Sequence, residues 1–215
     1  CKDGAVRMFR PRANAARMAA TARRTCMAPP PEDLFLEACE RVVRANADYV
    51  PPYGTGGSLY IRPLLIGSGA QIGVAPADAY TFLVLVVPVG AYYKGGLQPV
   101  RAAISDDYDR AAPLGVGNVK VAGNYAASLY AHEESKRRGY PVELYLDART
   151  HTFVEEFATS NFIAITRDGR YVTPDSRSIL PSVTNDTLQQ IARDLGMPVE
   201  VRPVRYEELA EFAEI

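Results

Sequence analysis

The sequence predicts an α+β fold with a small N-terminal domain and a larger C-terminal domain. Helical and extended patterns alternate along 215 residues, of which 47% are hydrophobic, so the chain is long enough to bury a core. The segment GAYYKGG, residues 90 to 96, combines three glycines with two tyrosines. We therefore expect domains at residues 1–89 and 97–215, with an interdomain connection at residues 90–96.

The N-terminal domain begins with a predicted short strand at residues 6–10, after which Pro11 suits the turn into a helix. A second helix is predicted within PEDLFLEACERVVRANA, residues 31–47, which has acidic residues in its first turn and arginines in its last turns. Its apolar stripe is expected to pack on a sheet and consists of Leu34, Ala38 and Val42.

Two segments, SLYIRPLLI and YTFLVLVVPV, are rich in β-branched and aromatic residues and predict buried strands. The second is far shorter than the roughly 20 residues that span a bilayer. In the first, Tyr60 and Arg62 alternate with Leu59 and Ile61, so the two polar side chains should share one face of the strand.

In the C-terminal domain, the order of elements follows from periodicity and from glycine or cap positions. We expect a strand at residues 99–105, a helix at 124–138 closed by Gly139, a strand at 142–147, a hairpin at 161–174 around Asp168-Gly169, a helix at 182–196 with Ser182 as N-cap, and a strand at 198–204. The last residues, AEFAEI, have a helical pattern.

Composition favours no highly charged partner. The chain has 24 basic and 25 acidic residues that are interspersed, so we expect no nucleic-acid or membrane partner. Three scattered cysteines form no disulfide framework, the first residues lack the apolar core of a secretory signal, and no metal site is expected. A cytoplasmic setting is the default interpretation.

The segment GVGNVKVAGNY, residues 115–125, places Lys120 between glycine-bearing stretches just before a helix. A nucleotide phosphate loop is a poor explanation because the pattern GxxxxGK[ST] is absent. An ordinary turn with a solvated lysine and a lysine that reacts with a cofactor aldehyde both remain open.

The longer segment GVGNVKVAGNYAASL is similar to the lysine segment of branched-chain amino acid aminotransferases, a branch of the fold type IV (class IV) enzymes that use pyridoxal 5'-phosphate (PLP). Five further segments follow the pattern of the same family in the same order: VRMFRPRANAARM, SLYIRP, VPVGAYYKGG, EEFATSNFIAI and SILPSVTNDTL. The resemblance implies a small α/β domain, a larger domain with a β-barrel-like core, and PLP between them.

The resemblance also implies roles for individual residues. Lys120 would bind PLP covalently and move the substrate proton. Glu156 would face the ring nitrogen, with Glu155 as the rival if the register slips by one residue. Arg10 would bind the phosphate and Tyr125 the phenolic oxygen of the cofactor. Without the family, Arg10 would suggest a surface ion pair and Tyr125 a packed side chain.

The other implied positions surround the same cofactor and its substrate. Leu180, Val183 and Thr184 would form a phosphate cup at a helix start, which is also compatible with a simple helix cap. Thr159 and Asn161 would support the ring. Tyr60, Arg62 and Tyr92 would line the substrate pocket, where Arg62 would meet the distal carboxylate of glutamate; buried packing is the alternative for the tyrosines.

The implied reaction is reversible amino transfer from leucine, isoleucine or valine to 2-oxoglutarate in a homodimer. Two alternatives stay open: another class IV enzyme, such as a D-amino acid aminotransferase or aminodeoxychorismate lyase, and a non-catalytic scaffold. SLYIRP and GAYYKGG favour the branched-chain enzyme. The chain starts without Met, and the Gly-Thr-Ala type loop of the family is absent, so we expect the sequence to be incomplete at both ends.

Overall fold

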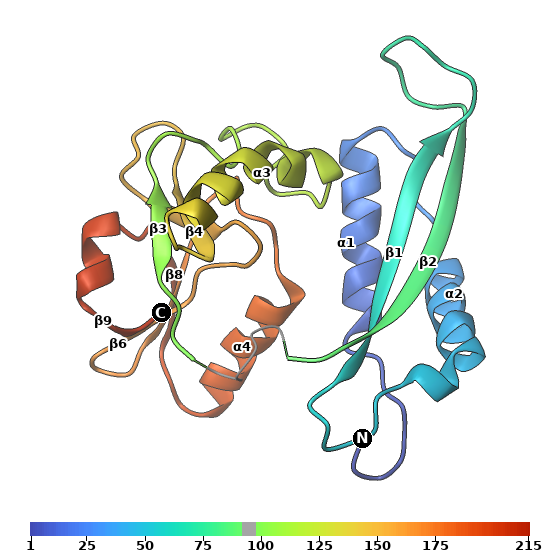
Figure 1. Ribbon diagram of the computed structural model, residues 1–215, viewed down its shortest axis with the longest axis horizontal. Coiled ribbons are helices and arrows are strands. Elements are labelled where there is room, and N and C mark those ends of the chain that lie inside the picture. Colours follow the sequence, from blue (N-terminus) through green and yellow to red (C-terminus); the bar gives the residue numbers. More distant parts are fainter. Residues whose placement is uncertain (92–97) are drawn as a thin grey trace. The chain divides into compact units, whose positions relative to one another are not determined.

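Figure 1 shows the computed structural model, which describes residues 1–91 and 98–215. The chain divides into two compact units, Cys1–Pro99 and Val100–Ile215. The predicted connection at residues 90–96 lies for its greater part outside the described residues. Among the described residues, no helix combines the length and apolar composition needed to cross a membrane.

The first unit contains both predicted helices and the two longer of its three predicted strands. They are α1 (Pro11–Arg24), α2 (Glu32–Ala45), β1 (Ser58–Ser68) and β2 (Ala79–Val89), with a short 3-10 helix, η1 (Ala47–Tyr49), after α2. β1 and β2 form a two-stranded antiparallel ribbon in which Ser58 pairs with Val89 and Ser68 with Ala79.

Both helices of this unit share a small core with the ribbon. Ala15 of α1 and Phe35 and Cys39 of α2 are buried, and Ile61 and Phe82 of the ribbon pack against them. The rings of Phe35 and Phe82 stack with centroids 6.0 Å apart. The prediction that α2 packs on a sheet is therefore confirmed.

The predicted apolar stripe of α2 was wrong by one residue. Leu34 is 47% exposed, whereas Phe35 and Cys39 are each 2% exposed. Burying the phenyl ring of Phe35 against Phe82 removes more apolar surface from water than burying Leu34 would, which determines the rotation of the helix.

Two further expectations for this unit were wrong. Residues 6–10 form no strand; instead Arg7 pairs with Asp3, and Arg10 takes a left-handed φ of 43° that leads directly into Pro11. The two ribbon strands are only partly buried, because alternate residues such as Leu64 and Ile66 stay exposed.

The second unit contains seven strands and two α-helices among its described residues. They are β3 (Ala102–Ser105), α3 (Ala122–Arg137), β4 (Val142–Leu146), β5 (Val154–Phe157), β6 (Ala164–Thr166), β7 (Tyr171–Pro174), α4 (Val183–Asp194), β8 (Val199–Arg202) and β9 (Phe212–Glu214), with a 3-10 helix η2 (Tyr206–Ala210) before β9. The strands form two sheets, ordered β3-β4-β5 and β8-β7-β6-β9. In the described part they do not close into the barrel-like core that was expected.

Turn and cap residues in the sequence predicted several elements of this unit correctly. β6 and β7 form the predicted hairpin, with Gly169 at φ 82° in its turn. Gly139, also at φ 82°, follows α3. The Ser182 side chain accepts a hydrogen bond from the Asn185 backbone N–H at 3.1 Å and so caps α4, as predicted.

The prediction of a helix at the last residues was wrong. Phe212 to Glu214 form a strand that pairs with Ile165 and Thr166 of β6. The Phe212 ring lies 6.2 Å from that of the fully buried Phe162 and packs on the core of the unit. Edge pairing and this packing override the local helical pattern.

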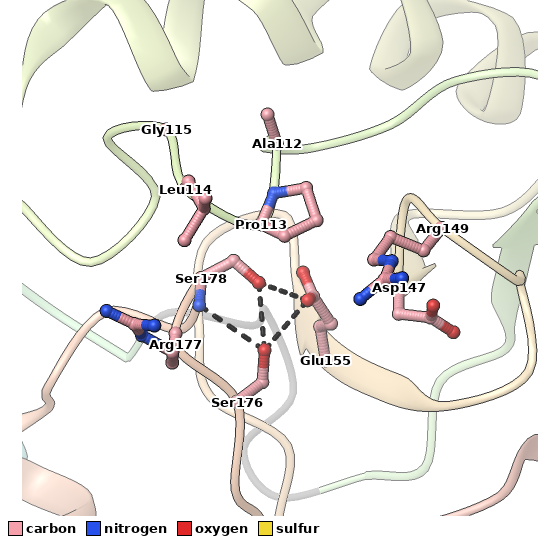
Figure 2. Close-up of a pocket in the computed structure, with 10 residues that line it drawn as sticks. All are labelled: Ala112, Pro113, Leu114, Gly115, Asp147, Arg149, Glu155, Ser176, Arg177 and Ser178. Carbon is pink, nitrogen blue, oxygen red and sulfur yellow. Dashed lines mark hydrogen bonds between the residues drawn. The ribbon is translucent and has the colours of Figure 1, made fainter.

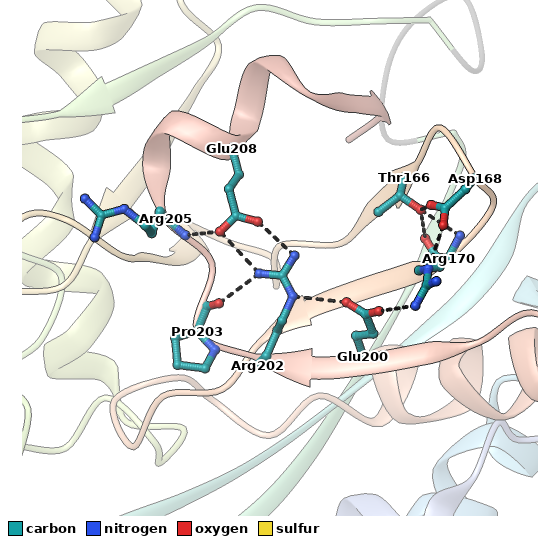
Figure 3. A network of polar contacts seen from close by, with 8 residues as sticks. All are labelled: Thr166, Asp168, Arg170, Glu200, Arg202, Pro203, Arg205 and Glu208. Atoms are coloured by element: carbon teal, nitrogen blue, oxygen red, sulfur yellow. Dashed lines mark hydrogen bonds and ion pairs between the residues drawn. The ribbon is translucent and has the colours of Figure 1, made fainter.

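A network of polar contacts joins the hairpin turn, β8 and η2 (Figure 3). Arg170 contacts Asp168 at 2.7 Å and Glu200 at 2.9 Å, and Arg202 contacts Glu200 and then Glu208 at 2.8 Å. Isolated exposed pairs contribute little to stability, but a chain of five charges fixes the relative positions of the three segments.

Asp147 closes the loop between β4 and β5. Its carboxylate accepts hydrogen bonds from the backbone N–H groups of Thr150, Thr152 and Phe153 at 2.8 to 2.9 Å. Partial burial opposes ionisation, but these hydrogen bonds outweigh it and lower the pKa of Asp147 to about 2.

We predict that Asp147→Ala lowers the free energy of unfolding by about 1 to 3 kcal/mol, because the loop loses its charged acceptor. In the wild type, the contribution of Asp147 to the free energy of unfolding is present above the ordinary carboxyl pKa of 3.8 and is lost as the pH falls through about 2. Denaturant unfolding at several pH values measures both effects, and Asp194→Ala, at an exposed position of α4, is the control. An equal loss in the two variants would contradict the prediction.

Candidate active site

Lys120 lies in the loop that leads into α3. Asn124, in the first turn of the helix, donates its side-chain amide to the carbonyls of Val116 at 2.8 Å and Val119 at 3.0 Å, which holds the loop against the helix. The Lys120 Nζ donates to the Tyr125 hydroxyl at 2.7 Å. Lys120 is exposed and Tyr125 is 36% exposed, so the structure brings together an accessible amine and a phenol.

Glu155 and Glu156 are adjacent on β5 and are both buried, but they make different contacts. Successive side chains of a strand point to opposite faces. Glu156 forms an ion pair with Arg110 at 2.8 Å and accepts a hydrogen bond from Asn161 at 2.6 Å. Glu155 instead accepts hydrogen bonds from the hydroxyls of Ser176 and Ser178.

The electrostatics of Glu156 are those of a buried acid with a cationic partner. Burial raises the pKa of Glu156 to about 7, against the opposing effects of Arg110, Asn161 and a hydrogen bond from the Leu180 backbone. An ionised carboxylate accepts about four hydrogen bonds. The three donors therefore leave room for one more, such as a protonated ring nitrogen.

Asn161 connects Glu156 to the start of α4. Its amide nitrogen also donates to the Leu180 carbonyl at 3.1 Å, and Asn185 of α4 donates to its side-chain oxygen at 3.3 Å. Val183 and Thr184 are the first two residues of α4, where backbone N–H groups favour an anion. Thr159, the remaining predicted residue of this region, is exposed.

A cavity of about 760 Å³ lies on the Glu155 side (Figure 2). Glu155 is 3% exposed, and its Oε2 has no hydrogen-bond partner among the described residues. The cavity is lined by Ala112, Pro113, Leu114, Gly115, Asp147, Arg149, Glu155, Ser176, Arg177 and Ser178. None of the residues expected to touch the cofactor or substrate lines it; only the rival Glu155 does.

The predicted site residues that belong to the first unit are located here by their surroundings in that unit alone. Arg10 is the exposed N-cap residue of α1. Tyr60 and Arg62 are exposed on one face of β1, as predicted, and the Arg62 guanidinium lies 5.3 Å from the centre of the Tyr60 ring. Tyr92 lies outside the described residues.

Sequence reasoning missed Arg110, which is 8% exposed and bound to Glu156. Its local sequence, SDDYDR, suggests a solvated run of charges, and nothing in it identifies a partner on β5. The polar setting of Glu155 was also missed. Among the described residues, no group of histidine, cysteine, aspartate or glutamate side chains is arranged to hold a metal ion.

The residues present suit a phosphorylated aldehyde with a basic ring. The accessible Lys120 amine can bind a carbonyl carbon, the Tyr125 hydroxyl lies beside it, Glu156 can accept from a ring nitrogen, and the start of α4 favours an anion. These are the groups that transfer of an amino group requires from a protein.

The chain belongs to the amino-transferase class IV family, whose model matches residues 2–215. It is 50% identical to the branched-chain-amino-acid aminotransferase of Haemophilus influenzae and 47% identical to that of Helicobacter pylori, with 100% and 99% of this chain aligned. It spans 64% and 63% of the length of these two relatives.

Solved structures agree with this assignment. The branched-chain amino acid aminotransferase of Escherichia coli superposes with a TM-score of 0.79 at 29% identity, over 95% of this chain and 66% of that one. The T.th. enzyme of the same name, in complex with N-(5'-phosphopyridoxyl)-L-glutamate, superposes with a TM-score of 0.76 at 27% identity, over 95% of this chain and 64% of that one. The expected family and fold type are thereby confirmed.

Proposed function

We propose that this protein is a PLP-dependent branched-chain amino acid aminotransferase. It transfers the amino group of leucine, isoleucine or valine to 2-oxoglutarate and yields the branched-chain 2-oxo acids and glutamate. The observation that carries the proposal is the 2.7 Å contact between the Lys120 amine and the Tyr125 hydroxyl, in a chain that is 50% identical to an enzyme of that name. A relative solved with a phosphopyridoxyl-glutamate compound supports the choice of cofactor and of glutamate.

PLP, when bound, supplies an aldehyde and an electron-withdrawing ring. In this proposal Lys120 would hold PLP at its aldehyde carbon and would move a proton at the substrate α-carbon. Tyr125 donates its hydroxyl to the phenolic oxygen, and Glu156 keeps the ring nitrogen protonated. The opposite faces of β5 support Glu156 over Glu155, because Glu156 is linked through Asn161 to Leu180 and α4.

The remaining roles follow the same assignment. Arg10, with Leu180, Val183 and Thr184, holds the phosphate, and Thr159 supports the ring. Tyr60, Arg62 and Tyr92 line the substrate pocket. The exposed face shared by Tyr60 and Arg62 supports this role, since both side chains are accessible to a ligand.

The domain boundary, assembly and location are part of the proposal. Residues 90–96 connect the two domains, and the protein acts as a homodimer in the cytoplasm. The division into units at Pro99 and Val100 supports the boundary, and the three cysteines, all without disulfides, are compatible with a reducing compartment.

Spectroscopy tests the function directly. The protein is mixed with PLP, its visible absorbance is recorded, and L-leucine and then 2-oxoglutarate are added. We expect leucine to remove the absorbance of the lysine-bound cofactor and 2-oxoglutarate to restore it. A response to D-alanine but not to L-leucine would favour another class IV enzyme, and no response to any amino donor would favour a scaffold.

We predict that Arg62→Met affects the two substrates unequally. The pocket must accept an uncharged side chain and a carboxylate in turn, and only the carboxylate needs the guanidinium. Loss of a charge-assisted contact should raise the apparent dissociation constant for glutamate roughly 10- to 100-fold, with a much smaller change for leucine. Single-turnover measurement of each half-reaction checks this, and equal losses in both would reduce Arg62 to a structural residue.

A further inference from the structure

Arg110 is a buried cation outside every expected site. It lies between β3 and α3, and its side chain is 6% exposed. Its Nη1 contacts a Glu156 oxygen at 2.8 Å, and its Nη2 donates to the Ser178 carbonyl. Burying an arginine is unfavourable unless its charge is paired, as Glu156 pairs it here, while the Arg110 Nε has no hydrogen-bond partner among the described residues. These two contacts join β5 to the loop that contains Leu180.

The loop before Lys120 also packs against Arg110. A Cβ atom at Gly117 would lie 2.7 Å from the Arg110 Nη2, 2.6 Å from the Ala111 Cβ and closer still to the Ser178 carbonyl. Only glycine fits there without displacing backbone or the buried guanidinium. Three segments with proposed cofactor residues, Lys120, Glu156 and Leu180, therefore converge around a single side chain.

Arg110 also pairs with Glu156, whose negative charge would keep the ring nitrogen protonated. The groups around Glu156 are Arg110, Asn161, the Leu180 backbone and the neighbouring Glu155. Burial raises the pKa of Tyr145 of β4 to about 12; Glu143 adds to this rise and Arg110 opposes it. Burial raises the pKa of Glu156, and Arg110 is the strongest of the opposing influences. Without Arg110, a larger fraction of Glu156 would be neutral at pH 7, and a neutral acid cannot keep a ring nitrogen protonated.

We infer that Arg110 is a positioning residue of the active site, which orients the Glu156 carboxylate and fixes the Lys120 loop and the Leu180 loop against it. The part that concerns the ring nitrogen rests on the proposed function. The contacts of Arg110 with Glu156, Ser178 and Gly117 do not.

The test compares Arg110→Met, Arg110→Lys and the control Arg193→Met, which changes an exposed arginine of α4. Glutamate carboxylates are labelled with carbon-13 in the protein without PLP and titrated by NMR, and the Glu156 signal is identified by its loss in Glu156→Gln. We expect the pKa of Glu156 to rise by about 1 to 3 pH units in Arg110→Met and by less in Arg110→Lys. Arg193→Met should titrate like the wild type.

With PLP bound, the half-reaction with leucine should reach its full rate only at higher pH in Arg110→Met. If Arg110→Met is too unstable to titrate, Arg110→Met/Glu156→Gln decides, because removing the unpaired acid should restore stability. An unchanged Glu156 titration, or equal instability of the single and double variants, would overturn the inference. A wild type that shows no response to PLP and leucine would defeat the proposed function instead, while the titration still decides whether Arg110 controls Glu156.

Discussion

Lys120→Ala is expected to abolish amino transfer and to remove the visible absorbance of lysine-bound PLP. Lys120 supplies the primary amine beside Tyr125, with its Nζ 2.7 Å from that hydroxyl. The variant therefore loses both the covalent attachment of the cofactor and the group that moves the substrate proton. The loss of rate should exceed that of every other variant considered for this protein.

Absorbance spectra and turnover with leucine and 2-oxoglutarate measure this outcome. Lys136→Ala is a matched control, since Lys136 is an exposed lysine of α3 that contacts Glu133 at 3.9 Å. It should keep the spectrum and the rate. Turnover of Lys120→Ala at the wild-type rate would mean that the central residue of the site is misassigned.

The elements that sequence reasoning predicted correctly are those with local causes. Gly169 and Gly139 take positive φ angles where turns were expected, and Ser182 caps α4 with its own side chain. The contact between Lys120 and Tyr125 was not itself predicted, but it is also local, because the two residues are separated only by the entry to α3. Turn and cap chemistry acts within a few residues, so it can be read from the sequence.

The errors come from contacts between distant segments. Phe35 rather than Leu34 faces the core because Phe82 of β2 lies opposite. The last residues form a strand because the edge of β6 is available to pair with Phe212. Neither partner is visible in the local sequence, so tertiary packing determines which face of α2 is buried and overrides the helical pattern at the last residues.

The candidate site shows the same division. The Glu155-Glu156 pair was identified from a motif, but the surroundings of each glutamate depend on residues far along the chain. Glu155 contacts Ser176 and Ser178, and Glu156 contacts Arg110. A buried arginine within a run of acidic residues gives no local signal. Its role becomes visible only when β5 and the loop before Lys120 are placed around it.

Glu156→Gln is expected to keep bound PLP while slowing removal of the α-proton. Glutamine can still accept a hydrogen bond, but it has no charge with which to keep a ring nitrogen protonated. Loss of a preorganised electrostatic contact at a reacting group typically lowers the rate on the order of 10² to 10³-fold. Arg110 would also lose its ionic partner, so some loss of stability is expected.

The pH dependence of stability separates this effect from a folding defect. Burial raises the pKa of Glu156 from 4.5 to about 7, so its contribution to stability is fully present below pH 4.5 and is lost as the pH rises through about 7. That loss should be absent in Glu156→Gln, which cannot ionise. Glu155→Gln is the control on the opposite face of β5, where the hydroxyls of Ser176 and Ser178 are its partners. Single-turnover rates with leucine compare the two variants, and an equal or greater loss in Glu155→Gln would show that the two glutamates had been assigned in the wrong order.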